Sequence, residues 1–242
     1  MIQPELTMVP ARFNGPNRSG NGGWVSGHVG GRLASRTGVA TVTVTLRQPP
    51  PLETALTWRD GRDEVALLHE GSVVGEAAAG VFVDDAPAPV THAVAAQARA
   101  DFEGYHEHPF PRCFTCGSDR AEGDGLRLFS GPVGDGRMAA TWTPHAAFCD
   151  DTGTLTTESF WAALDCPGGW AAGIKASPMV LGRMTARLDE APRAGEECVA
   201  VGSLREVQGR KHQTATALYG TDGRLLGRAE QTWITIDIAA FS

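Results

Sequence analysis

Two similar stretches of the sequence decide the fold. Residues 61–83 read GRDEVALLHEGSVVGEAAAGVFV, and residues 209–235 read GRKHQTATALYGTDGRLLGRAEQTWIT. Each begins with Gly-Arg, runs into an extended segment, turns at a glycine, and continues with an apolar pair, a glycine, a charged residue and an alanine. The Asp222-Gly223 turn of the second stretch tolerates the positive φ angles of a tight hairpin. The chain therefore contains a weak internal duplication in which each copy predicts a β-hairpin.

The duplication continues upstream of both hairpins. In the first half, Thr41–Leu46 alternates β-branched residues as strands do, and a Pro-rich turn leads to a strand near Thr54–Trp58. In the second half, Met184–Leu188 is followed by a turn and by a strand near Glu197–Leu204. A further hairpin is predicted ahead of the second helix, from 125–129 and 138–142, around the glycines at 131–136.

A helix is predicted ahead of each set of strands. The first spans Gly22–Ser35 after Asn21, and the second spans Thr157–Gly173 with Thr156 or Thr157 as its cap. Both have little polar surface, which indicates burial. Each interior glycine costs about 1 kcal/mol relative to alanine, so close approach of a neighbouring backbone is expected to offset that cost. A buried helix wrapped by a curved antiparallel sheet is the α+β arrangement that fits this pattern.

The duplication also predicts the domain organisation. We expect a first unit over residues 1–83, a connecting segment over residues 84–124, and a second unit over residues 125–242. The connecting segment is expected to hold a turn near Asp85–Pro89 and a helix near Val90–Phe102.

Composition excludes several classes of protein. The 242 residues include 21 Lys+Arg against 28 Asp+Glu, and a net charge of −7 argues against non-specific nucleic-acid binding. The sequence has no apolar run of about 18 residues that could span a membrane, and its N-terminus lacks the pattern of a signal peptide. The odd number of cysteines, 5, argues against a disulfide framework. We therefore expect a cytoplasmic protein.

Three short motifs resemble those of acyl-CoA thioesterases with the hotdog fold. Asn17-Arg18-Ser19-Gly20-Asn21-Gly22-Gly23-Trp24-Val25 resembles the loop that leads into their helix, with Asn21 in place of the usual His. The 160–169 segment, FWAALDCPGG, resembles the central helix of phenylacetate-pathway thioesterases. The duplication and the closing 225–231 segment look like the thioesterase II group. The resemblance implies two tandem hotdog folds, each a long helix wrapped by a curved antiparallel sheet, fused as a pseudo-dimer.

The resemblance also implies one composite site. Single-hotdog thioesterases take Gly-Gly amides from one subunit and a carboxylate from the other, so we expect Asn21, Gly22 and Gly23 to face Asp165. Amides at a helix start could stabilise an oxyanion, and Asp165 could activate water or attack directly. The alternative is that these are packing glycines and that Asp165 is a locally bonded polar residue of the helix.

Further site residues follow from the same resemblance. In the thioesterase II group a Gln on the last strand holds the hydrolytic water, and Gln231 falls there. Glu158 could replace that group's Asp, and Val180 or Met179 lies near its Thr. Basic residues at strand starts could receive the phosphates of coenzyme A, or could form a solvated rim. We assign substrate contacts to Asn17, Trp24, Trp161, Arg210 and Lys211.

The connecting segment carries a second motif, a Cys-x-x-Cys pair with two nearby histidines. Cys113 and Cys116 with His106 and His108 could form a tetrahedral zinc site, or the two thiols could be a redox pair. The interpretation we favour is a loop with buried thiols, so we predict no metal and no cofactor. Cys166 beside Asp165 could be a nucleophile, but no His is positioned by sequence to activate it.

The predicted function is hydrolysis of acyl-CoA thioesters to free acid and CoA between the two hotdogs. The alternative is a non-catalytic acyl-CoA or lipid-binding protein on the same fold. A dehydratase is a third option, but neither His28 nor His145 has the spacing that such an enzyme needs. The expected partner is a small acyl-CoA substrate, with no nucleic acid and no membrane. Exposed sheet edges could also support a homo-oligomer.

Overall fold

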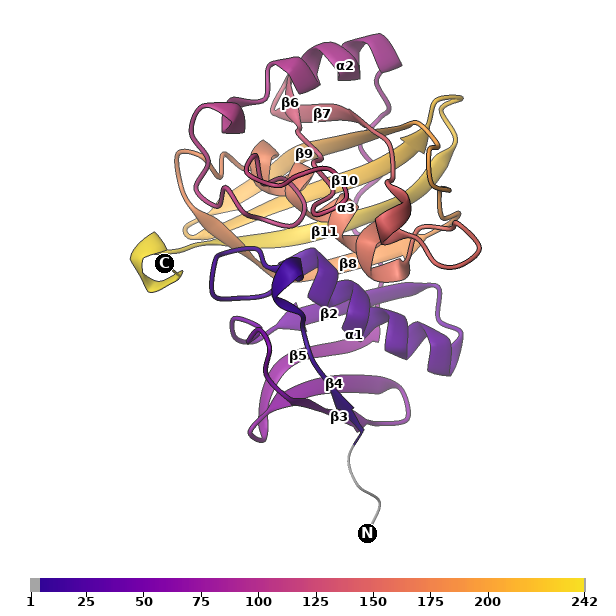
Figure 1. Ribbon diagram of the computed structural model, residues 1–242, viewed down its shortest axis with the longest axis vertical. Coiled ribbons are helices and arrows are strands. Elements are labelled where there is room, and N and C mark those ends of the chain that lie inside the picture. The colour runs from indigo at the N-terminus through magenta and orange to yellow at the C-terminus, as the bar shows by residue number, and fades with distance from the viewer. Residues whose placement is uncertain (1–4, 242) are drawn as a thin grey trace.

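One antiparallel sheet runs through the whole molecule. The computed structural model describes residues 5–241, and its eleven strands lie in the order β1-β3-β4-β5-β2-β8-β11-β10-β9-β7-β6 (Figure 1). The strands of the first half are β1 (Leu6–Thr7), β2 (Thr41–Leu46), β3 (Leu56–Asp60), β4 (Glu64–His69) and β5 (Ser72–Ala79). Those of the second half are β6 (Gly131–Gly134), β7 (Arg137–Trp142), β8 (Met179–Leu188), β9 (Cys198–Gln208), β10 (Lys211–Gly220) and β11 (Leu225–Thr235).

The two duplicated hairpins occupy matching places in this sheet. Residues 61–83 contain β4 and β5, and residues 209–235 contain β10 and β11, as predicted. From β2 the strands run outward as β5, β4, β3, and from β8 they run outward as β11, β10, β9. The halves join where β2 pairs with β8, from Thr41 opposite Arg187 to Thr45 opposite Arg183.

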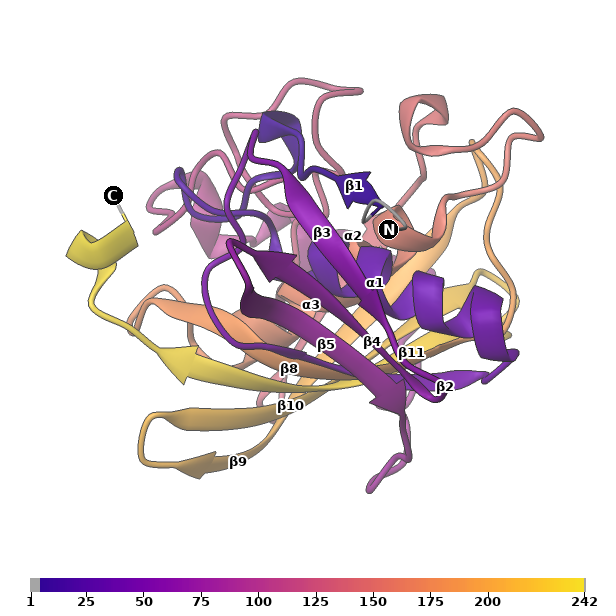
Figure 2. The same cartoon turned by 90° about the horizontal axis from the view of Figure 1, so that it is seen from below.

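The helices are α1 (Gly22–Thr37), α2 (His92–Ala100) and α3 (Thr157–Ala171), with short 3-10 helices at Ala11–Phe13, Glu103–Tyr105, Ala146–Phe148 and Ile238–Phe241. Helices α1 and α3 pack against each other on the same side of the sheet (Figure 2). None of the helices within residues 5–241 is long and apolar enough to cross a membrane.

Glycine lets α1 approach α3 closely. A Cβ on Gly23 would lie 2.9 Å from Ala162 Cα, and one on Gly27 would lie 2.7 Å from Glu158 Cα. Such distances are too short for any side chain, so glycine is required at both crossings. This contact is the neighbouring backbone that the glycine content of α1 predicted.

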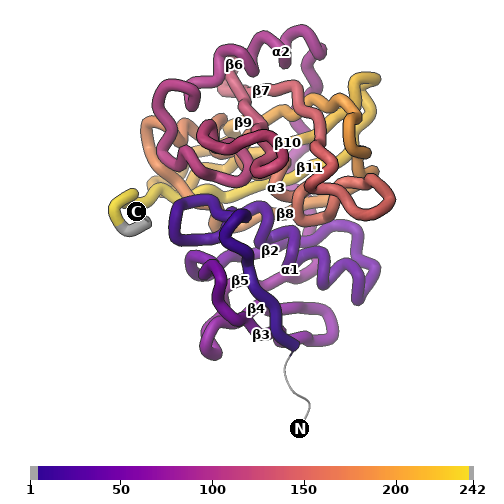
Figure 3. The backbone as a smooth tube through the Cα atoms, in the orientation of Figure 1, coloured from indigo at the N-terminus to yellow at the C-terminus, as the bar shows by residue number. Residues whose placement is uncertain are grey.

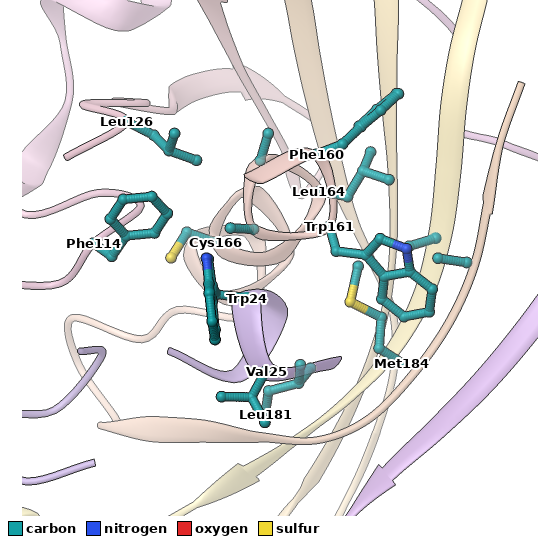
Figure 4. Close-up of a cluster of buried hydrophobic side chains, with 14 of the residues drawn as sticks. Trp24, Val25, Phe114, Leu126, Phe160, Trp161, Leu164, Cys166, Leu181 and Met184 are labelled. Carbon is teal, nitrogen blue, oxygen red and sulfur yellow. The ribbon is translucent and has the colours of Figure 1, made fainter. Parts of the chain in front are cut away.

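Helix α3 is the centre of the core. Every residue from Ser159 to Ala171 is buried, and the helix continues through Pro167. In Figure 4, Trp161 points toward Met184 on one side of α3, whereas Cys166 points toward Phe114 on the other. The Phe114 side belongs to the connecting segment, so this segment completes the core around α3.

The connecting segment covers both faces of the second half. Helix α2 lies on the outer face, where Ala95 and Ala98 cluster with Ala139, Val199 and Ala217. Since side chains alternate along a strand, their neighbours Ala140, Ala200 and Leu218 point to the opposite face, into the core beside α3. The chain then returns from α2 across the second half before it enters β6 (Figure 3).

One predicted strand is wrong. Residues 125–129 are not a strand, and the hairpin is formed instead by β6 and β7. The reason is that Leu126 N–H donates to Phe114 O at 2.8 Å and Leu128 N–H donates to Thr115 O at 2.9 Å. These residues therefore pair with the cysteine-containing loop and bury their leucines there, rather than at a sheet edge.

Candidate functional site

Asp165, near the middle of α3, lies against the beginning of α1. Its side chain is 2% exposed. Oδ2 accepts a hydrogen bond from Gly23 N–H at 3.1 Å and another from Asn21 Nδ2 at 3.1 Å. The structure thus brings together the residues of the two halves that the sequence analysis paired, while their catalytic roles stay a prediction.

Asn21 has two functions in this contact. Its Oδ1 accepts from Trp24 N–H at 2.8 Å, which caps α1, and its Nδ2 donates to Asp165. Capping fixes the orientation of the side-chain amide, so the donor group is already directed at the carboxylate. Gly23 brings the two helices together here, since a Cβ at this position would be 2.5 Å from Asp165 Cβ.

The Asp165 carboxyl group has a raised pKa. Burial and, to a smaller extent, the nearby Cys113 raise its pKa to about 8, even though the hydrogen bonds from Gly23 and Asn21 oppose the shift. Oδ1 is buried and has no hydrogen-bond partner among the described residues. A carboxyl group with a pKa near physiological pH can both accept and return a proton.

Only one of the three predicted amides is free. Asn21 N–H donates to Phe13 O at 2.7 Å, and Gly23 N–H donates to Asp165. Gly22 N–H has no partner within residues 5–241. At the start of a helix such an amide points out along the axis, where it can bind an anionic oxygen. The structure therefore narrows the candidate oxyanion donors to Gly22.

A cavity of about 210 Å³ adjoins this contact, between the two halves of the chain. Asn21, Gly22 and Asp165 line it. Its other walls are mostly apolar and come from both halves and from the connecting segment, namely from Leu46, Pro49, Pro50, Phe110, Ile174, Met179, Val180, Leu181, Trp233 and Ile234. Arg47, which is exposed and forms an ion pair with Glu76, stands at the rim. Trp233 also lines the cavity, and its buried Nε1 has no hydrogen-bond partner within residues 5–241.

Three cysteines line the same cavity. Cys113 and Cys116 from the connecting segment and Cys166 from α3 are all buried, and their sulfur atoms lie within 4.8 Å of one another. Hydrogen bonds from the other two thiols lower the pKa of Cys113 well below its usual value, whereas burial raises those of Cys116 and Cys166. Cys113 and Cys116 are far from Asp165 in the sequence, so the contribution of the connecting segment to this cavity could not be predicted from the motifs.

The histidines do not join the two cysteines. His108 Nε2 donates to Cys116 O at 3.0 Å, and its Nδ1 accepts from Phe110 N–H at 2.9 Å. Both ring nitrogens are therefore used by the backbone, and His106 is exposed. The Cys₂His₂ set considered from the sequence is replaced by a cluster of three thiols.

Gln231 lies beneath α3. Its Nε2 donates to Leu164 O and to Thr216 Oγ1, and its Oε1 accepts from Thr214 Oγ1 at 2.6 Å. Its amide is thus fully bonded to the protein and is absent from the cavity lining, so the structure does not place it where it could hold a water. Glu158 lies at the other end of the helix pair, where it meets His28 at 3.4 Å.

The predicted substrate contacts also lie outside the cavity lining. Trp24 stacks on Phe13 with ring centroids 4.3 Å apart, and Trp161 packs against the glycines of α1. Asn17 is exposed in the loop before α1, and Arg210 and Lys211 are exposed at the β9–β10 turn. The basic residue that does reach the cavity, Arg47, carried no signal in the sequence beyond its charge.

Comparison with known proteins identifies the fold. No family model matches the sequence, and no curated protein is similar to it. In structure, the chain is similar to a tesB protein of Mycobacterium avium subspecies paratuberculosis, with a TM-score of 0.63 and 11% identity over 96% of this chain and 92% of the other. An acyl-CoA thioesterase II of Mycobacterium marinum gives a TM-score of 0.57 and 15% identity over 96% and 92%.

A protein of unknown function with a hotdog fold from Alicyclobacillus acidocaldarius gives a TM-score of 0.58 and 13% identity over 98% of this chain and 95% of the other. At these identities the similarity is one of fold. The chain therefore has a hotdog fold like that of thioesterase II proteins, and the resemblance found in the sequence is confirmed at that level.

Proposed function

We propose that the protein hydrolyses acyl-CoA thioesters to a free acid and CoA. One observation carries the proposal: the carboxyl group of Asp165, with one unpartnered oxygen, lies beside the free N–H of Gly22 in a mostly apolar cavity. The names of the tesB and acyl-CoA thioesterase II neighbours support the choice of substrate.

We further infer that the chain is a fused pair of hotdogs, with units over 1–83 and 125–242 joined by 84–124. The mirrored strand orders around β2 and β8 support this arrangement. The helix contact supports it as well, since Gly23 meets Ala162 and Gly27 meets Glu158. Gly23 and Glu158 are the second residues of α1 and α3, and Gly27 and Ala162 are the sixth residues. Each helix therefore contacts the other through the same two positions. A composite site between the two units therefore corresponds to the site that single-hotdog thioesterases form between two subunits.

In the proposed mechanism, the thioester carbonyl oxygen accepts the hydrogen bond of Gly22 N–H. Asp165 Oδ1 takes a proton from water as the water oxygen attacks the carbonyl carbon. The tetrahedral intermediate then expels the CoA sulfur, which receives the proton back from Asp165. The apolar walls hold the acyl chain, and Arg47 at the rim attracts the phosphates of CoA.

Release of thiol from a series of acyl-CoAs tests this function. We expect turnover by the wild-type protein to depend on chain length, because a cavity of about 210 Å³ holds a limited acyl group. Absence of thiol release across the series would reject the hydrolase.

A non-catalytic acyl-CoA-binding protein is the second candidate. It is favoured by the small number of groups at the cavity, since Gly23 N–H is already bonded and Gln231 is directed elsewhere. Calorimetry with the same acyl-CoAs separates the two, because saturable binding without thiol release supports the second candidate alone.

A further inference from the structure

The three thiols at the cavity come from two segments that are far apart in the sequence. Cys113 and Cys116 belong to a loop of the connecting segment, and Cys166 belongs to α3. All three are at most 4% exposed. The proposed hydrolysis uses none of them, so their convergence at one point of the cavity wall calls for a separate explanation.

The spacing of the sulfur atoms fits a metal ion. In a tetrahedral zinc site the Zn–S distance is about 2.3 Å, which places two ligand sulfurs about 3.8 Å apart. Cys113 Sγ and Cys166 Sγ are 3.7 Å apart, and all three sulfurs lie within 4.8 Å of one another. Only a small contraction would bring the third sulfur into the same geometry.

A backbone turn within the loop and a side-chain hydrogen bond to α3 hold the cysteines in place. Gly117 N–H donates to Cys113 O at 2.8 Å, and Thr115 Oγ1 donates to Ala162 O of α3 at 3.1 Å. Gly117 has no room for a side chain, because a Cβ there would lie 2.5 Å from Cys113 O. The thiols are therefore preorganised on a fixed loop, which lowers the entropic cost of binding an ion.

A neutral side chain, that of Asn21, lies between the thiols and the Asp165 carboxyl group. Asn21 Nδ2 lies 3.7 Å from Cys113 Sγ and 3.1 Å from Asp165 Oδ2, so the thiol and the carboxyl group share one neutral donor. Among residues 5–241, no Lys, Arg or His forms an ion pair with Asp165. A buried cation at the thiols would be stabilised by these groups, because buried charges need a partner of opposite sign.

We propose that Cys113, Cys116 and Cys166 bind one thiophilic divalent cation of the zinc type, with the fourth coordination position open to the cavity. Thiolates are the ligands that such ions prefer, and three protein ligands with one open position are a known arrangement for zinc. The ion would tie the connecting segment to α3 in the cavity wall. Binding of the ion is independent of whether the protein hydrolyses thioesters.

Cobalt titration of the reduced, metal-free full-length protein tests the site. We expect one Co²⁺ per chain, with the intense visible bands of a tetrahedral ion and a near-ultraviolet thiolate-to-cobalt charge-transfer band. Added Zn²⁺ should abolish both signals by displacing the cobalt. Lack of Co²⁺ uptake by the folded, reduced chain, or the weak bands of an octahedral ion, would overturn the proposal.

Variants identify the ligands. Cys166→Ser and Cys113→Ser should each lose the charge-transfer band and most of the bound metal, whereas Cys149→Ser, at a cysteine outside the cluster, should keep both. Metal retained by Cys166→Ser with unchanged spectra would refute the assignment. Should the cluster variants not fold, the charge-transfer intensity of the wild-type complex still counts the thiolates: three support the proposal, and fewer reject it.

Discussion

The two ends of the α1–α3 helix pair can be compared directly, because each helix contacts the other through the same positions counted from its start. At one end, the start of α1 faces Asp165, the ninth residue of α3. At the other end, the start of α3 lies beside α1, whose ninth residue is Gly30. A Cβ on Gly30 would lie 3.0 Å from the ring of Trp161, so that position is filled by an aromatic side chain of the opposite helix.

The polar groups at the two ends differ accordingly. At the end with Gly30, one cavity of about 220 Å³ has no carboxylate in its lining, and a second cavity is lined by His28 and by the partly exposed Glu158. The nearest acid–base pair there, His28 and Glu158, is partly exposed. Crossing geometry alone therefore does not form the candidate site. A buried carboxyl group and a free helix-start amide must meet at one cavity, and they do so at the Asp165 end.

The largest expected effect comes from Asp165→Asn. This change keeps the shape of the side chain and its hydrogen bond from Gly23, but removes the proton acceptor. We expect kcat for thiol release to fall on the order of 10²- to 10⁴-fold, the usual contribution of a general base. Steady-state kinetics with the best acyl-CoA measures the loss, and circular dichroism checks that the variant is folded.

Glu158→Gln is the matched control, since it neutralises the carboxylate at the opposite end of the helix pair. We expect kcat to change by less than about twofold, because Glu158 lies outside the cavity beside Asp165 and its partly exposed pair with His28 is weak. Equal losses in the two variants would remove the functional distinction between the two ends.

Alanine at the two crossing glycines gives the next largest effect. Gly23→Ala and Gly27→Ala each insert a methyl group against the opposite helix, and both should destabilise the fold by about 1–3 kcal/mol. Only Gly23 touches Asp165, so only Gly23→Ala should also lower kcat/KM, by roughly 10- to 100-fold through misplacement of the carboxyl group. Urea unfolding and kinetics of the pair measure both quantities, and equal kinetic losses would contradict the comparison.

A smaller effect is expected from the two helix caps. Asn21 caps α1 and Thr156 caps α3, so Asn21→Ala and Thr156→Ala should each lower the free energy of unfolding by about 1 kcal/mol. Because Asn21 alone also donates to Asp165, turnover should fall in that variant and stay near wild type in Thr156→Ala. A turnover loss confined to Thr156→Ala would contradict the proposed site, because it would place the site at the start of α3 and not at Asp165.

The smallest effect is expected at the cavity wall. Trp233 lines the cavity, and its Nε1 has no hydrogen-bond partner among residues 5–241, whereas Trp170, another buried tryptophan, is absent from that lining. If the substrate accepts the Trp233 hydrogen bond, Trp233→Phe should raise KM roughly 2- to 10-fold, the usual value of one such bond. Trp170→Phe should leave KM unchanged, and equal effects in the two variants would exclude a direct contact.

Most of the fold could be predicted from local sequence patterns. The cap of α1, the strand at Thr41–Leu46 and the Asp222-Gly223 hairpin are each specified by neighbouring residues. The strand predicted at 125–129 failed because Leu126 and Leu128 bind a loop that is close in space, which alternation within the segment does not reveal.

The site was predictable only in part, for the same reason. The pairing of Asp165 with Asn21–Gly23 came from a family resemblance, and the two groups indeed lie together. The third thiol and Arg47 could not be found this way, because Cys166 meets Cys113 only through the path of the connecting segment. Gln231 occupies the expected strand, but the direction of its side chain depends on packing under α3.

The ladder between β2 and β8 has a consequence for cooperativity. The halves share main-chain pairing from Thr41 to Thr45 and a hydrogen bond of 2.8 Å between the hydroxyls of Thr43 and Thr185. Opening this ladder would expose unpaired backbone and separate α1 from α3, so neither half can unfold while the other keeps its native packing. The protein should therefore melt in a single transition, and Asp165 should lose its helix-start partner only when the whole molecule unfolds.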